Sequence, residues 1–158
     1  MTETQALVGQ VGPIIERLLA RLETLDEATL NSAPAWEGAN SPYVIVAHVL
    51  GNARAWVLGI ACGEPVRRDR PAEFASRGRC SDLRAAWAEL APEIEHAAAA
   101  LKPADLDRTL LPSRELWGEG EPHEVSVRQA FLHVIEHASI HLGQMQTTLD
   151  LMKSEGAR

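Results

Sequence analysis

The chain has 158 residues, with 22 acidic and 15 basic side chains and a formal net charge of −7. This length is typical of one domain, here residues 1–158, and is sufficient to bury a hydrophobic core without disulfides or metal. The acidic balance and the lack of a long basic run argue against a nucleic-acid-binding protein, because contact with phosphates needs a basic face.

The chain is expected to be soluble, cytoplasmic and without a membrane partner. Its N-terminal segment lacks the basic and apolar regions of a secretion signal. The most apolar run, residues 44–62, is interrupted by polar and charged side chains and is too polar for a membrane span. Cys62 and Cys80 are the only cysteines, and their spacing fits neither a zinc knuckle nor a redox motif, so we expect reduced thiols, with a packing role for Cys62.

Apolar residues recur with a helical period, and no strand-like alternation is evident. The first helix is predicted at about residues 4–24, where Pro13 indicates a kink or a later start. Residues 26–39 then form a loop anchored by Trp36. A second helix, at about residues 41–62, has Ser41 as its cap and Pro42 in its first turn.

After a charged connection over residues 67–79, the third helix is predicted at about residues 82–101, capped by Ser81 or Asp82. The connection over residues 103–125 is too long for a tight turn, which indicates a lid or a crossover. Ser126 and Gln129 match a capping box, so a fourth helix should run from there to about Lys153, before a polar tail. The fold class is therefore all-α, a four-helix bundle, in which metal sites are built from facing side chains.

Three of the six histidines, His133, His137 and His141, recur every four residues in the fourth helix. At ~100° per residue, His141 lies about 50° from the centre of the apolar arc, His137 about 90° and His133 about 130°. His137 and His141 should therefore face the bundle, while His133 should lie near the exposed face. We expect His96 and His123 at the surface.

His48 stands alone in the very apolar second helix, where a buried imidazole needs a partner or a cavity. Together with His137 and His141 it would give three neutral nitrogen ligands and an open fourth position, the arrangement of catalytic metal sites. Nitrogen ligands favour Zn²⁺, Ni²⁺, Fe²⁺ or Co²⁺ over Mg²⁺ or Ca²⁺. The alternative for each histidine is a hydrogen-bonded core residue.

The segment from His133 to His137 also matches H-x-x-E-H, the inverted zinc-peptidase motif. That motif would need the outward-facing His133 as a ligand and would leave His141 without a role. Glu136, its general base, projects to the polar face of the helix. We therefore disfavour a peptidase.

Two segments resemble the DinB-like superfamily: Asn40-Ser-Pro ahead of His48, and EHASIHLGQMQ at residues 136–146. Residues 68–74 are also similar to a stretch in some members. The superfamily includes thiol-dependent transferases that use bacillithiol or mycothiol, and mycothiol-dependent maleylpyruvate isomerases. The resemblance implies an up-down-down-up bundle with a long crossover, often a homodimer, and a divalent metal on His48, His137 and His141.

The resemblance predicts a metal-dependent thiol S-transferase, in which a low-molecular-weight thiol attacks a small electrophile as the thiolate. Further candidates for the pocket and for orienting the ligands are Asn52, Arg54, Arg68, Arg70 and Gln144. Asn52 would orient His48, Gln144 is similarly placed for His141, and the arginines would bind carboxylates unless they pair with Asp69 and Glu73. Trp36, Trp56 and Trp117 are candidate pocket walls, with core packing the alternative for Trp56.

A second hypothesis remains open: a non-catalytic metal-binding or ligand-binding bundle with a role in stress. The sequence offers no general base beyond the ligands that would decide between the two.

Overall fold

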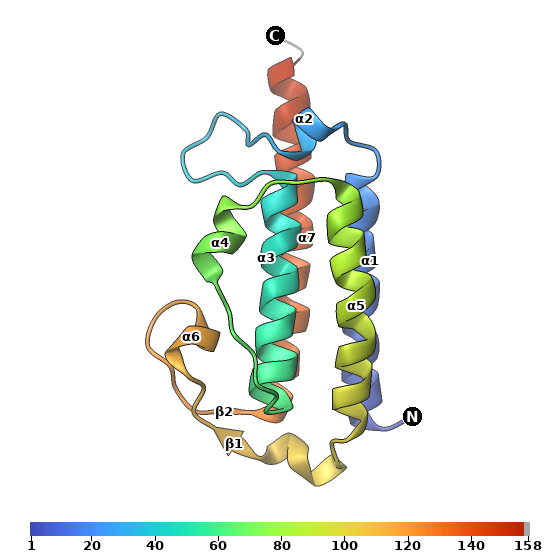
Figure 1. Ribbon diagram of the computed structural model, residues 1–158, viewed down its shortest axis with the longest axis vertical. Coiled ribbons are helices and arrows are strands. Elements are labelled where there is room, and N and C mark those ends of the chain that lie inside the picture. Colours follow the sequence, from blue (N-terminus) through green and yellow to red (C-terminus); the bar gives the residue numbers. More distant parts are fainter. Residues whose placement is uncertain (157–158) are drawn as a thin grey trace.

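The computed structural model describes residues 1–156, and four long helices lie side by side along its long axis (Figure 1). They are α1 (Glu3–Leu22), α3 (Pro42–Ala53) continued by the π-helix η1 (Arg54–Ala61), α5 (Cys80–Ala99) and α7 (Val127–Gly156). The predicted all-α four-helix bundle is confirmed. The last helix extends three residues beyond the predicted end, and the end of the expected polar tail, residues 157–158, lies outside the described residues.

The helices follow an up-down-down-up course: α1 and α7 run in one direction, and α3 and α5 in the other (Figure 1). Each of α1 and α3 packs against both α5 and α7. The metal-ligand candidates therefore come from two neighbouring antiparallel helices, α3 and α7.

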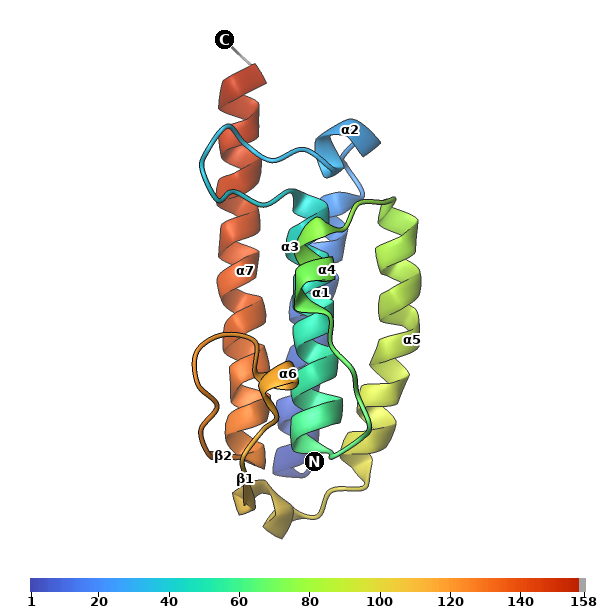
Figure 2. The same ribbon diagram turned by 60° about the vertical axis from the view of Figure 1, so that its left-hand side comes forward.

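The crossover is residues 62–79, not residues 103–125 as the length of that connection suggested. Because α3 and α5 follow each other and are parallel, the chain must return along the whole bundle, and it forms α4 (Arg70–Ala75) on the way (Figure 2). The segment between α5 and α7 joins two helix ends at the same end of the bundle.

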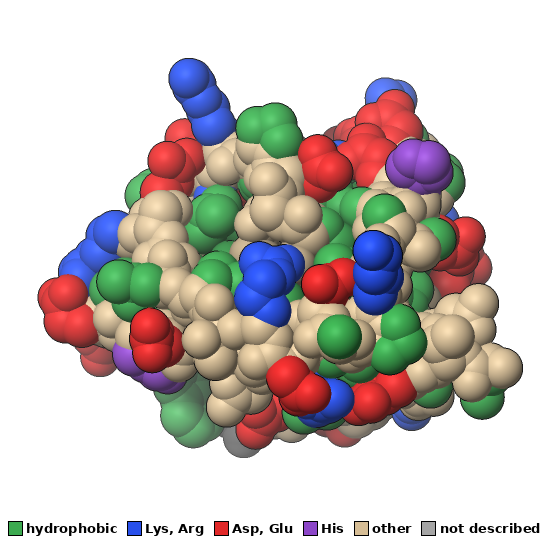
Figure 3. Space-filling model, turned by 90° about the horizontal axis from the view of Figure 1, so that it is seen from below, with side chains coloured by type: hydrophobic (Ala, Val, Ile, Leu, Met, Phe, Trp, Pro, Cys, Tyr) green, Lys and Arg blue, Asp and Glu red, His purple; other side chains and the backbone are tan. Residues whose placement is uncertain are grey.

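That second connection contains more structure than predicted: η2 (Pro103–Asp107), β1 (Thr109–Leu110), α6 (Arg114–Trp117) and β2 (Val125–Ser126). The two strands pair antiparallel, but with two residues each they are too short to show an alternating pattern. Acidic and basic side chains are interspersed at this end of the bundle (Figure 3). Among them, Arg128 of α7 bonds Asp107 and, at 2.7 Å, Glu3.

Two of the predicted helix starts are confirmed by their hydrogen bonds. Ser41 Oγ accepts from the Val44 amide at 3.2 Å, and Ser126 and Gln129 exchange the two bonds of a capping box. The predicted start of α5 was wrong: Asp82 accepts from the amide of Arg79, so the helix begins two residues earlier than expected.

The first helix is confirmed near its predicted bounds: α1 begins at Glu3 and runs through Pro13, so the alternative of a start at Pro13 was wrong. The predicted loop after it needs correction, because α2 (Glu27–Leu30) forms there. Trp36 does not anchor that loop in the core, because 70% of it is exposed.

The core is built from apolar side chains of all four long helices, such as Ile15, Ile45, Ile94 and Phe131. The helical segment Pro42–Ala61 is long and apolar enough to cross a membrane, but 78% of its most apolar window is buried inside the bundle, as in a core helix. Both cysteines are free, and burial raises the pKa of Cys62 to about 11, which suits the predicted packing role.

Replacing Phe131 with alanine should lower the free energy of unfolding by about 3–5 kcal/mol, because this ring is fully buried at the start of α7. Its neighbour Leu132 is 48% exposed, so Leu132→Ala should cost less than about 0.5 kcal/mol. Urea titrations of the two variants measure the difference, and equal losses would contradict the packing described here.

Candidate metal centre

Three imidazoles meet between α3 and α7. One ring nitrogen each from His48, His137 and His141 lies within 4.8 Å of the others. The Nε2 atoms of His48 and His137 are 3.1 Å apart, and the rings of His137 and His141 have centroids 4.4 Å apart. Ligands of a tetrahedral zinc ion lie about 3.4 Å from one another, so small side-chain movements would bring all three into place.

His48 is held from the side opposite the other two histidines by Glu73 of α4. Its Nδ1–H donates to Glu73 Oε2 at 2.8 Å. Because a carboxylate only accepts, this bond fixes the proton on Nδ1 and turns the lone pair of Nε2 toward the other imidazoles. The crossover thus sets the tautomer that metal binding requires.

Glu73 is itself fixed by Arg68, whose Nε and Nη2 donate to its two oxygens at 2.8 and 3.0 Å. The two side chains are only 3% and 11% exposed. Burial alone would raise the pKa of Glu73, but the hydrogen bonds from His48 and Arg68 outweigh it and hold the pKa below its usual range. The carboxylate therefore remains charged.

Gly51 of α3 makes room for this carboxylate. A Cβ atom at this position would overlap the Glu73 carboxyl group. Any side chain at residue 51 would push Glu73 away from His48, so this close approach needs glycine.

His141 is oriented by Gln144, as the sequence suggested. Its Nδ1–H donates to Gln144 Oε1 at 2.6 Å, which leaves the Nε2 lone pair free. Burial lowers the pKa of His141, with the nearby His48 acting in the same direction. His141 therefore has its ligating nitrogen available at neutral pH.

His137 has its ring centroid 4.9 Å from that of His48 and 4.4 Å from that of His141, and burial and the neighbouring histidines lower its pKa to about 2. Its Nδ1 is buried, and no hydrogen-bond partner for it occurs in residues 1–156. Its Nε2 faces the Nε2 lone pair of His48, a contact that needs a proton or a cation between the two atoms. The donor set therefore fits a shared transition-metal ion.

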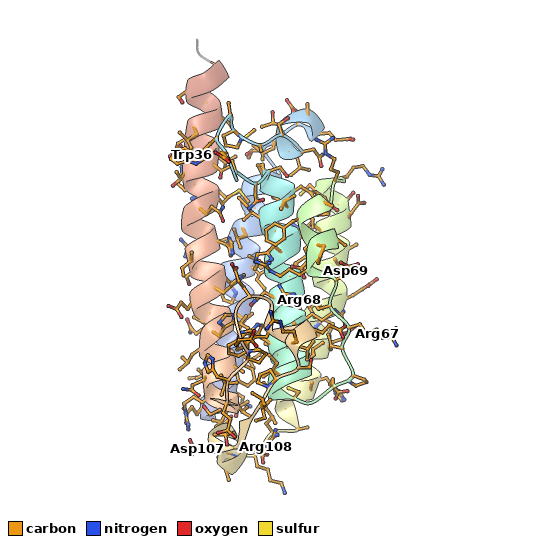
Figure 4. All side chains as sticks on the ribbon, turned by 90° about the vertical axis from the view of Figure 1, so that its left-hand side faces the viewer. Trp36, Arg67, Arg68, Asp69, Asp107 and Arg108 are labelled. Carbon is orange, nitrogen blue, oxygen red and sulfur yellow. The ribbon has the colours of Figure 1, made fainter. Side chains whose placement is uncertain are left out.

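The three candidate arginines, Arg54, Arg68 and Arg70, lie in different surroundings. Arg54 pairs with Glu93 at 2.9 Å on a partly exposed surface and does not line the cavity beside the histidines. Arg68 points from the crossover toward α3 and α7, whereas Arg67 points to solvent (Figure 4). Arg70 lines the cavity, pairs with Glu119 at 3.3 Å and lies over the ring of Phe74.

Asn52 does not orient His48, because its Nδ2 donates instead to His133 Nε2 at 3.2 Å. His133 in turn is not on an exposed face: it is half-buried and stacks on Trp56, with ring centroids 3.6 Å apart. Helical periodicity measures only the direction to the bundle core. It could not show that η1 and the connection before α7 cover this side of the helix.

A cavity of about 450 Å³ opens beside these side chains. Trp117 of α6 and Trp56 of η1 form part of its wall, with ring centroids 5.1 Å apart, whereas Trp36 lies by the C-terminal half of α7 (Figure 4). The lining residues are His48, Asn52, Trp56, Arg68, Arg70, Trp117, Gly118, Glu119, His123, Val125, Gln129, His133 and His137.

Residues 14–145 match the family model of the DinB superfamily. The chain belongs to this superfamily. The match covers most of the chain and includes all three clustered histidines. No curated protein matches the chain. Membership of the DinB superfamily suggests a metal-binding helical protein, in agreement with the arrangement of the imidazoles.

The sequence predicts Glu73 only as a partner for the arginines. It does not predict that Gly51 makes room for the Glu73 carboxylate. Glu73 is 25 residues from His48, in a crossover whose path the helical pattern does not determine. The one signal in the sequence is that Gly51 lies within a predicted helix, where a glycine allows another group to approach the backbone closely.

Glu73→Gln should weaken metal binding about 10–100-fold, because an amide orients His48 less firmly than a carboxylate. Titration with Zn²⁺ against a competing chelator measures the affinity. Glu119→Gln, which removes an exposed partner of Arg70, should leave it unchanged. Equal affinities in the Glu73→Gln variant and the unaltered protein would contradict the orienting role.

Chelator-treated protein should lose stability as the pH falls from 7 to 5. Burial lowers the pKa values of His133 and His137 to about 4 and about 2, whereas unfolded histidine titrates at ~6.5. Between these values the unfolded state binds more protons, so the free energy of unfolding falls with the pH. The pKa of Glu73 is lowered from 4.5, so its contribution is lost only below this window.

Urea midpoints at pH 7, 6 and 5 measure this dependence. His133→Gln should flatten it, while His96→Gln, an exposed histidine on α5, should not. An unchanged slope in His133→Gln would contradict the assignment.

Proposed function

We propose that this protein binds one divalent transition-metal ion, Zn²⁺, Ni²⁺ or Fe²⁺, through His48, His137 and His141, and that it is a thiol S-transferase. Its cofactor would be a low-molecular-weight thiol such as mycothiol or bacillithiol, and its substrate a small electrophile. The observation that supports this most is the position of the cavity, which begins at His48 and His137 of the histidine cluster. Three imidazole ligands and adjoining space are the arrangement that leaves a coordination position for a ligand.

A bound divalent ion would supply the positive charge that keeps a thiol deprotonated near neutral pH. The residues around it have separate tasks. Glu73 and Gln144 hold two of the imidazoles in the ligating tautomer, and Arg68 keeps Glu73 charged. Trp56 and Trp117 form an aromatic part of the cavity wall.

Arg70 is the cation best placed to bind a carboxylate of the thiol or the electrophile. Its partner Glu119 has a side chain that is 86% exposed, and exposed ion pairs are weak. Arg68 is unsuited to this task, because Glu73 already occupies its guanidinium.

In the proposed transfer, a carbon–sulfur bond forms between the thiolate and an electrophilic carbon. In a substitution the bond to the leaving group breaks and the leaving group departs with the electron pair. In an addition the proton lost by the thiol returns to the neighbouring carbon. Cys62 and Cys80 take no part, since burial raises the pKa of both thiols.

One observation favours the alternative of metal or ligand binding without turnover. Glu73, the buried carboxylate beside the cluster, is bonded to both His48 and Arg68 and is not free to act as a base. Turnover would then depend on the metal and the thiol alone. The homodimer and the cytoplasmic location also remain part of the proposal.

The test combines metal content with thiol consumption. Protein purified without a polyhistidine tag should contain about one equivalent of a transition metal. It should also speed the reaction of bacillithiol or mycothiol with 1-chloro-2,4-dinitrobenzene. His141→Ala should reduce the rate to that of the uncatalysed reaction, and His96→Ala, on the exposed face of α5, should not.

Metal binding without any thiol-dependent rate would support the non-catalytic alternative and overturn the transferase. A protein that takes up no Zn²⁺, Ni²⁺ or Fe²⁺ would overturn both.

A further inference from the structure

The cavity beside the histidine cluster is lined by two side chains that each keep a polar atom without a partner. These atoms are Asn52 Oδ1 and Trp56 Nε1, and within residues 1–156 neither has a hydrogen bond. Both residues are well buried, at 3% and 4% exposure. Buried polar atoms are nearly always paired, so two unpaired ones in side chains that line a cavity need partners from outside the chain.

His133 holds both side chains in position. Its Nε2 accepts from Asn52 Nδ2 at 3.2 Å, which leaves Asn52 Oδ1 as a free acceptor. Its ring stacks on the Trp56 indole at an interplanar angle of 20°. Because an indole N–H can only donate, the pair keeps one unpaired acceptor and one unpaired donor.

The surroundings favour an uncharged ligand group. Arg68, the most buried cation in the cavity wall, is occupied by Glu73. Aromatic rings of Trp56 and Trp117 line the same part of the cavity and suit a planar group. A carboxamide is planar and uncharged, and it offers both an N–H donor and a carbonyl acceptor.

We propose that Asn52 and Trp56 form an amide subsite: Asn52 Oδ1 accepts from the amide N–H of a ligand, and Trp56 Nε1–H donates to its carbonyl. Asn52 lies one turn beyond His48 on α3, and His133 one turn before His137 on α7, which is about 6 Å along the helix axes. An amide bound there would place the rest of a small molecule beside the three imidazoles.

The subsite also narrows the proposed substrate class to small electrophiles that carry a carboxamide. This assignment of substrate rests on the proposed thiol transfer. Amide binding itself does not, because it uses neither the metal nor the thiol.

The probe is benzamide, and the readout is the indole N–H signals of the four tryptophans in ¹H–¹⁵N spectra. Trp56→Phe identifies its own signal by removing it while keeping an aromatic ring to stack on His133. Benzamide should shift the Trp56 signal saturably, whereas the exposed Trp36 should not respond. Benzoate and acetophenone both lack an N–H donor for Asn52 Oδ1, so each should shift the Trp56 signal with an affinity about tenfold weaker.

Variants give a second, independent measure. Asn52→Leu and Trp56→Phe should each weaken benzamide binding about tenfold, and Trp36→Phe should leave it unchanged. The comparison of the three probes on the unaltered protein needs no variant, so it holds even if Asn52→Leu fails to fold. A Trp56 signal that benzamide does not move, or equal binding of all three probes, would overturn the subsite.

The titrations are run on chelator-treated and on Zn²⁺-loaded protein. Benzamide binding in a protein that shows no thiol transfer would support the subsite and overturn only the transferase. Thiol transfer without benzamide binding would overturn the subsite and leave the transferase standing.

Discussion

The buried ion pair between Arg68 and Glu73 is the contact on which the rest of the site depends. Removing two charges from water is costly, and the cost is offset here because the guanidinium donates twice to the carboxylate and His48 donates a third bond. With these three bonds the carboxylate is satisfied, so the His48 ring has one orientation and one tautomer. The lone pair of its Nε2 then points toward α7, where His137 and His141 lie.

The topology of the bundle explains why these charges come from the crossover. Consecutive parallel helices force residues 62–79 to run back along the molecule, and this path carries α4 past the middle of α3. Gly51 lets the carboxylate approach the helix at that point. The same segment places Arg70 in the lining of the cavity, so one connection both orients a metal-ligand candidate and shapes the adjoining cavity.

The two proposals describe neighbouring parts of one groove between α3 and α7. His48 and His137 lie at one level, and Asn52 and His133 lie one turn away on the same two helices. The two pairs recur because α3 and α7 are antiparallel neighbours. Four residues are about one turn on either helix, so side chains one turn further along both helices meet again. The proposed metal ion and the proposed amide would therefore lie at successive levels of one groove.

The helical period, the serine caps and the inward direction of His137 and His141 could all be predicted from the sequence, because each depends on residues within a few turns of one another. The resemblance to the DinB-like superfamily added the position of His48 opposite the last helix and the course of the helices. Glu73, Gly51, Trp56 and the role of His133 were decided by tertiary structure alone. Their contacts join residues 22 to 81 positions apart through connections without a periodic pattern, and no local preference specifies which side of a helix such a connection covers.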